Sequence, residues 1–141
     1  MTETYDPTNI FARILRGEIP RHEIFEDEVA LAFMDVMPQS KGHCLVIPKA
    51  PSRNLLDASD DTLAQLMPRV ARLARAARKA FDADGILVSQ FNEAPAGQTV
   101  FHLHVHVIPR YAGVVLVPHS GGMADPGMLA EQAALIRAAL D

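Results

Sequence analysis

The chain has 141 residues and a formal net charge of −4, with 49% hydrophobic and 21% charged residues, a size and composition that fit one compact domain spanning residues 1–141. It lacks both an apolar run of roughly 20 residues that could cross a bilayer and the basic-then-apolar pattern of a secretion signal, so we expect no membrane partner and a cytoplasmic location. The acidic balance disfavours a dedicated nucleic-acid binder, and the lone Cys44 leaves neither an internal disulfide nor a cysteine pair for structural zinc.

The first third of the chain predicts a short helix followed by strands. Residues 9–16 favour a helix, with Asn9 as N-cap and Gly17 just past the end. Apolar stretches then recur around residues 24–25, 29–34 and 44–47, separated by charged or Pro/Gly turns. Three short antiparallel strands are the simplest interpretation.

A long helix is predicted from Ser59 to about Phe81, because apolar residues recur there at three- and four-residue spacing. Such a helix should pack on a sheet. Pro68 lies well inside it, so we expect a kink or a local break there. Arginines recur every third residue from Arg69 to Arg78, and we interpret them as a solvated helix face rather than a nucleic-acid patch.

The last part of the chain predicts two more strands and another helix. Residues 86–91 and 100–108 have the composition of strands, joined by a loop at 92–98, and Pro109 should end the second. A Pro/Gly-rich stretch at 118–127 precedes a helical pattern at 128–140, which should pack on the same domain or on a partner subunit. Taken together, the chain therefore predicts five strands and three helices.

Three of the six histidines lie at alternate positions in one predicted strand. Alternate side chains of a strand point to opposite faces, so His102, His104 and His106 should share one face, and Phe101, Leu103, Val105 and Val107 the other. Adjacent imidazoles cannot all be protonated cheaply, so a purely structural role is disfavoured. The isolated His22 and His119 are interpreted as ordinary structural residues.

Two kinds of chemistry suit this cluster. Neutral imidazoles could bind zinc or another divalent ion, although the flanking Gln98 and Thr99 are hydrogen-bonding groups rather than the usual supporting ligands. Alternatively, one neutral imidazole could attack an electrophile while its neighbours donate hydrogen bonds or protons. The residues by themselves leave both possibilities open.

The pattern His-φ-His-φ-His-φ-φ, where φ is apolar, is matched in full by residues 102–108, and on it the chain resembles the histidine triad (HIT) superfamily. Further segments resemble the HINT-type branch in the expected order: 9–11, 17–20, 26–27, 31–36, 38–39, 42–43, 45–49 and 97–100. The resemblance covers roughly residues 9–110, the core of the domain, and leaves 111–141 as an extension.

The resemblance implies a HIT-like α+β fold with an antiparallel sheet of about five strands, a homodimer, and a purine nucleotide or nucleotide conjugate as the ligand. It implies that His104 attacks the α-phosphorus of a nucleoside 5′-monophosphate derivative and forms a nucleotidyl-histidine that water then cleaves. His102 would orient His104, while His106 and His43 would bind phosphate oxygens or aid proton transfer. Phosphoramidates, adenylylated amines and dinucleoside polyphosphates are the expected substrates, and no cofactor is expected.

The resemblance also implies a set of substrate contacts. Asp35 would bind the ribose hydroxyls, and Asn92, Gln98 and Thr99 would surround the phosphate, with Thr99 in place of the commoner serine. The base would lie in an apolar pocket made by Ile10, Phe11, Ile14, Phe33 and Val36. For Ile14 and Val36, ordinary core packing explains the apolar side chain equally well.

Three departures from the family pattern matter. Zinc-containing relatives carry two cysteines and a histidine where this chain has Asn9, Ala12 and Pro51, so no metal site is expected. The loop 93–96 is poorer in glycine, and the tail beyond Tyr111 differs from the short HINT end. A purine nucleotide-binding module with incidental turnover and a metal-dependent hydrolase therefore remain as alternative functions.

Overall fold

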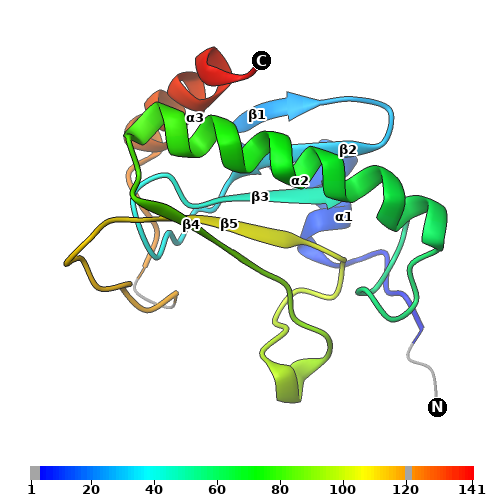
Figure 1. The fold of residues 1–141 in the computed structure, drawn as a ribbon. Coiled ribbons are helices and arrows are strands. Elements are labelled where there is room, and N and C mark those ends of the chain that lie inside the picture. Colours follow the sequence, from blue (N-terminus) through cyan, green and yellow to red (C-terminus); the bar gives the residue numbers. More distant parts are fainter. Residues whose placement is uncertain (1–3, 120–121) are drawn as a thin grey trace.

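The computed structural model describes residues 4–119 and 122–141, and it has three α-helices and a single five-stranded sheet (Figure 1). The strands are β1 (Glu23–Glu26), β2 (Ala30–Met34), β3 (Cys44–Pro48), β4 (Gly85–Ser89) and β5 (Val105–Arg110). They lie in the order β1-β2-β3-β5-β4, and every neighbouring pair is antiparallel. The predicted α+β class and the five-stranded antiparallel sheet are confirmed.

The helices divide between the two faces of the sheet. The long helix α2 (Asp60–Phe81) crosses one face with α3 (Pro126–Ala139) beside it, and the short α1 (Ile10–Leu15) lies behind the sheet (Figure 1). Side chains of the central strands alternate accordingly. Val46 packs in the core under α2, whereas Leu45 packs in a second cluster with Phe11 of α1. The α1 face is therefore only partly covered by helix.

The helix ends follow the sequence predictions. Asn9 caps α1 by accepting a hydrogen bond from the Ala12 N–H, and Gly17 follows the helix with φ = +79°. Ser59 caps α2 in the same way through the Thr62 N–H. The predicted C-terminal helix is also present, and α3 packs on α2 of the same chain.

Of the two predictions about prolines, the strand end at Pro109 is wrong, whereas at Pro68 the local break is absent and the kink stays a prediction. A local break was one outcome expected at Pro68, yet α2 continues through it without interruption. Both Pro68 and Ala64, whose carbonyl loses its helical partner, are exposed, so water can hydrate that carbonyl. Pro109 lies within β5 rather than at its end. Because β3 pairs with β5 only as far as Val107, no strand lies along the β3 side of β5 at Pro109, and the missing N–H of proline breaks no hydrogen bond there.

No helix in the described ranges is both long and apolar enough to cross a membrane. The arginine row on α2 is tied to the protein's own surface: Arg69 pairs with Asp27 at 2.8 Å, and the Arg72 guanidinium lies 5.2 Å from the centre of the Phe25 ring. These contacts agree with a structural helix face.

Candidate active site

The histidine segment is extended, but the strand starts later than predicted. β5 begins at Val105 rather than Val100, because the preceding chain leaves the sheet and the Leu103 N–H donates to the Ser52 carbonyl at 2.8 Å. The predicted alternation still holds for the histidines. Leu103 and Val105 pack in the core under α2, whereas His106 stands opposite Leu45 on the α1 face.

The predicted apolar face has one exception. Phe101 is half-buried and lies beneath the Arg53 guanidinium, whose carbon is 4.2 Å from the ring centre. Phe101 is absent from both buried core clusters. The interpretation of this residue as part of the strand's core face is therefore wrong, because the chain has not yet entered the sheet at this point.

Hydrogen bonds to carbonyl oxygens define the protonation of two triad rings. His104 Nδ1 lies 2.6 Å from the His102 carbonyl, so Nδ1 carries the proton and Nε2 has the lone pair. His102 Nε2 lies 2.8 Å from the Pro48 carbonyl and therefore carries that ring's proton. The remaining lone pair of His102, on Nδ1, accepts from the Tyr5 hydroxyl at 2.6 Å. His102 has no ring nitrogen left for a substrate.

The other two predicted catalytic histidines are bonded to each other. The Gln39 N–H donates to His43 Nδ1 at 3.0 Å, so the proton of the neutral His43 ring is on Nε2. His43 Nε2 lies 3.0 Å from His106 Nδ1, which must then accept, and His106 carries its own proton on Nε2. Within the described residues, that N–H of His106 has no protein acceptor.

All four rings are buried, with 0–8% of their surface exposed. Burial lowers the pKa of His43 to about 3 and that of His102 to about 4. Burial lowers the pKa of His106 to about 3, with repulsion from neighbouring histidines adding to the shift, and it also lowers the pKa of His104. At neutral pH the cluster therefore consists of neutral imidazoles, as a nucleophile requires.

One ring nitrogen of these four histidines has an unused lone pair: His104 Nε2 has no hydrogen-bond partner among the described residues. In that part of the chain, no fully buried side-chain nitrogen or oxygen lacks a partner, so His104 Nε2 must retain some accessible surface. The Phe11 ring packs edge-on against His104, with centroids 4.9 Å apart. The arrangement presents one neutral ring nitrogen with an accessible lone pair beside the N–H donor of His106, whose ring centroid is 5.1 Å away.

Asp35 lies beside the cluster, and the structure adds a histidine that the sequence interpretation had classed as structural. Asp35 is 5% exposed and accepts from the Met37 N–H at 2.8 Å. His119, from the tail, donates from Nε2 to Asp35 Oδ2 at 2.7 Å, and its ring lies 5.7 Å from that of His43. His119 was missed because an isolated histidine far along the chain carries no spacing signal.

Asp35, His43 and His106 also bring three potential metal ligands within 4.8 Å of one another. Their hydrogen bonds do not suit a cation. A metal on His43 Nε2 would need that atom deprotonated, which would place the ring proton on Nδ1, against the Gln39 N–H. Binding would therefore require the Gln39 contact to break, and the cluster as it stands does not fit a metal ion.

The predicted base-pocket residues mostly gather on the α1 face. Phe11 and Phe33 pack edge-on with ring centroids 5.6 Å apart, and Ile14 belongs to the same buried cluster. Ile10 is 45% exposed at the start of α1. Val36 instead packs against the core under α2, so the structure does not bring it together with the other four.

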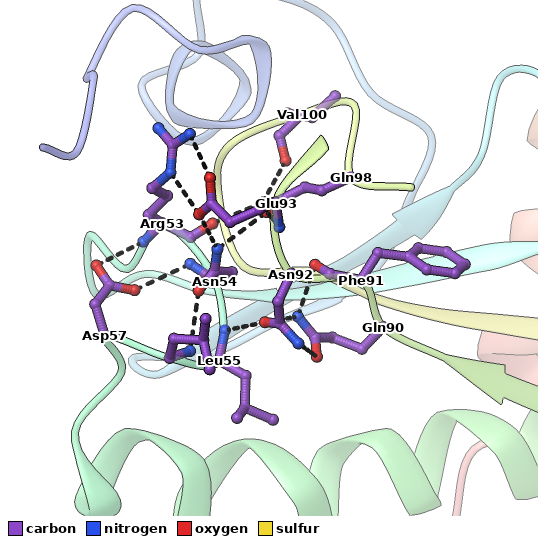
Figure 2. Close-up of polar contacts among 11 residues, drawn as sticks. Arg53, Asn54, Leu55, Asp57, Gln90, Phe91, Asn92, Glu93, Gln98 and Val100 are labelled. Carbon is purple, nitrogen blue, oxygen red and sulfur yellow. Dashed lines mark hydrogen bonds and ion pairs between the residues drawn. The ribbon is translucent and has the colours of Figure 1, made fainter. Parts of the chain in front are cut away.

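The three predicted phosphate contacts have different surroundings, and Figure 2 shows those of Gln98 and Asn92. Gln98 is buried and uses its whole amide, donating to the carbonyls of Arg53 and Val100 and accepting from the Asn54 side chain and the Glu93 N–H. The Asn92 side chain bonds Gln90 and the Leu55 N–H. Thr99 is exposed and lines a hollow of about 340 Å³ with Ile10 and Phe101.

Glu93 holds this loop in an unusual backbone conformation. Its φ of +74° and ψ of 157° are rarely adopted by residues other than glycine. The Glu93 carboxylate accepts from Arg53 at 2.8 and 2.9 Å and from the Asn54 amide at 2.6 Å (Figure 2). These contacts hold in place the loop that leads into the histidine segment. The pattern of apolar and polar residues in the sequence gave no indication of them.

Comparison with known proteins gives consistent matches. The HIT domain family model matches residues 16–113. Among curated proteins, the adenylylsulfatase HINT3 of Arabidopsis thaliana is 37% identical over 101 residues, which are 72% of this chain and 51% of that protein.

Two solved structures extend the similarity over nearly the whole chain. A Hit-like protein involved in cell-cycle regulation from Bartonella henselae, crystallised with an unknown ligand, is 52% identical with a TM-score of 0.91, covering 97% of this chain and 100% of that one. A hypothetical histidine triad nucleotide-binding protein from Sulfolobus tokodaii is 33% identical with a TM-score of 0.85, covering 92% and 89% of the two chains. The likeness therefore includes the tail that carries His119.

Proposed function

This chain belongs to the HIT domain family, and from that premise we propose that it is a nucleotide-binding hydrolase or transferase whose nucleophile is His104. The substrates are nucleoside 5′-monophosphate derivatives: phosphoramidates, adenylylated amines or dinucleoside polyphosphates. The observation that carries the proposal is that the neutral His104 ring has an accessible lone pair on Nε2. The hydrogen bond from Nδ1 to the His102 carbonyl fixes this tautomer and the orientation of the ring.

In the first step His104 Nε2 forms a bond to the α-phosphorus while the bond to the leaving amine or oxygen breaks, and the leaving group takes up a proton from solvent as it departs. The Nδ1–H bond to the His102 carbonyl stabilises the positive charge that develops on the ring. His106 directs its Nε2–H at a phosphate oxygen, and His43 fixes that tautomer through its own Nε2–H. His102 positions His104 and does not contact substrate.

For the substrate pocket, we propose that Ile10, Phe11 and Phe33 hold the base, and that the exposed hydroxyl of Thr99 contacts phosphate. We assign Gln98 and Asn92 to shaping the phosphate loop, because their side-chain amides already bond the protein. In this proposal residues 1–141 act as one domain.

The test is turnover of an adenosine 5′-phosphoramidate by the wild type and by His104→Ala. The substitution should lower the rate by about a thousandfold or more, since it removes the attacking atom. The matched control is His22→Ala, which changes a histidine outside the cluster. Equal turnover by His104→Ala and the wild type would exclude the mechanism. AMP binding without turnover of any such substrate would favour a binding module, and loss of activity in EDTA a metal-dependent hydrolase.

We also propose that the protein is a homodimer joined at β4. This strand is at the edge of the sheet, and its outer flank has no partner in the described part of the chain. Leu87 and Val88 on β4 are 38% and 45% exposed. Val115, which follows β5 in the chain, is 82% exposed. An apolar free edge favours pairing with a second copy. Light scattering should give a dimer for the wild type and a monomer for Val88→Lys, whereas Leu56→Lys, at a site outside the sheet, should stay dimeric.

A further inference from the structure

The tail places His119 against the histidine cluster through contacts on both sides of that residue. The Val117 N–H donates to the Gln39 carbonyl at 3.0 Å, and the Gln39 side-chain amide donates back to the Val117 carbonyl at 3.3 Å. Farther along, the Ala124 N–H donates to the Val36 carbonyl at 2.8 Å. The segment is thus fastened to the loop that follows β2, the same loop that carries Asp35 and leads to His43.

The ring of His119 is near the reacting groups and in contact with solvent. Its centroid lies 5.8 Å from that of His106, and the two rings are almost perpendicular at 88°. The His119 side chain is 36% exposed, whereas the Asp35 side chain with which it pairs is 5% exposed. This ring is therefore in contact with solvent, whereas the other four histidine rings of the cluster are buried.

The proposed reaction needs a base that the buried histidines do not supply. A water molecule must attack phosphorus in the second step, and its proton must go to an acceptor. His102 and His43 each use their ring lone pair to accept a bond from Tyr5 or from the Gln39 N–H. The lone pair of His106 accepts from His43, and that of His104 is bonded to phosphorus in the intermediate.

His119 meets this need. Because its Nε2–H donates to Asp35, the neutral ring has its lone pair on Nδ1, and that atom has no hydrogen-bond partner among residues 4–119 and 122–141. A carboxylate on one ring nitrogen and a free lone pair on the other is the arrangement by which an Asp–His pair acts as a general base. We propose that Asp35 and His119 form such a pair and that His119 Nδ1 accepts the proton of the hydrolytic water, an inference that rests on the proposed function.

The second step then balances. The water oxygen forms a bond to phosphorus, the bond between phosphorus and His104 Nε2 breaks, and its electron pair returns to that nitrogen. The water proton moves to His119 Nδ1, and the Asp35 carboxylate stabilises the resulting imidazolium. The products are the nucleoside monophosphate, neutral His104 and protonated His119, which releases its proton to solvent or to the next leaving amine.

The first test is His119→Gln, which retains a donor for Asp35 and removes the base. Rapid quenching with the adenosine phosphoramidate should show a burst of released amine. Intact mass should show nucleotidylated protein accumulating, because the second step slows by about 10²–10⁴-fold. His22→Gln is the matched control and should behave as the wild type. Unchanged turnover, or slow turnover with no accumulated intermediate, would overturn the proposal.

The second test separates this role of Asp35 from the ribose contact implied by the family resemblance. Asp35→Asn should accumulate the same intermediate with the adenosine substrate and with its 2′,3′-dideoxy analogue. A rise in KM for the adenosine substrate alone, with no accumulation, would assign Asp35 to the ribose and overturn the pair. His104→Ala checks the proposed function separately: if it still turned over substrate, the covalent route itself would fail, whatever His119 does.

Discussion

Acidification from pH 7.5 to 5.0 should destabilise this protein strongly, because buried histidines resist protonation only while the chain is folded. His43 and His106 have a pKa of about 3 and His102 of about 4 in the folded chain, against 6.5 for an ordinary histidine. Since the folded pKa is depressed, the stabilising contribution is complete above pH 6.5 and is lost as pH falls toward 4 and then 3.

The magnitude follows from these shifts. Each pH unit below 6.5 costs about 1.36 kcal/mol per ring, because the unfolded chain binds a proton that the folded chain does not. At pH 5.0 the cost is about 2 kcal/mol per ring and about 6 kcal/mol for His43, His102 and His106 together. Ordinary domains are stable by only about 5–15 kcal/mol, so the loss should be visible as a large shift of the unfolding midpoint.

Urea unfolding at pH 7.5 and 5.0 measures the difference directly. Ordinary carboxyl groups, with pKa values near 4, remain largely ionised across this window, so histidines dominate the change. His106→Gln should lose about 2 kcal/mol of the pH-dependent drop, about a third of it, whereas the matched control His22→Gln should retain the whole drop. Equal stability of the wild type at the two pH values, or an unaltered drop in His106→Gln, would refute the reasoning.

Two further substitutions test the supports of the site. Gln98→Ala should lower the free energy of unfolding by about 3 kcal/mol or more in urea denaturation, because it leaves several buried polar groups unpaired; a change below about 1 kcal/mol would contradict the bracing role. Gly42→Ala should lower the Tm more than Gly17→Ala does. Both glycines have positive φ, but only at Gly42 would the new Cβ lie 2.6 Å from the Phe81 ring. Equal Tm losses would count against the close contact.

The elements and the histidine face could be predicted because they depend on local periodicity. The apolar spacing of α2 and its cap at Ser59 depend on residues close together in the chain, and the sequence predicts both. The sequence does not predict the start of β5, because that start depends on where the chain begins to pair with β3. The hydrogen bond from Leu103 to Ser52, which keeps the preceding residues out of the sheet, joins segments far apart in the chain. Pairing partners are not encoded in a short window, so strand ends are the least predictable part of the fold.

The site shows the same division. The triad was found because alternation in a strand fixes which side chains share a face. Tyr5 and His119 were missed, because each reaches the cluster across about a hundred or eighty residues of chain, and neither has a spacing signal. For Gln98 the family resemblance implied a contact with phosphate, but it gave no sign that the side-chain amide would be fully hydrogen-bonded within the protein.

Burial of the four clustered histidines links the stability of the protein to its chemistry. The desolvation that makes His43, His102 and His106 costly at low pH also keeps His104 neutral with its lone pair available. The same burial prevents those rings from carrying a proton at neutral pH, although the proposed hydrolytic step must move one. A site built this way needs one imidazole at the solvent boundary, where a cation can be hydrated. The tail provides it in His119, and a carboxylate already stands beside that ring to stabilise the charge.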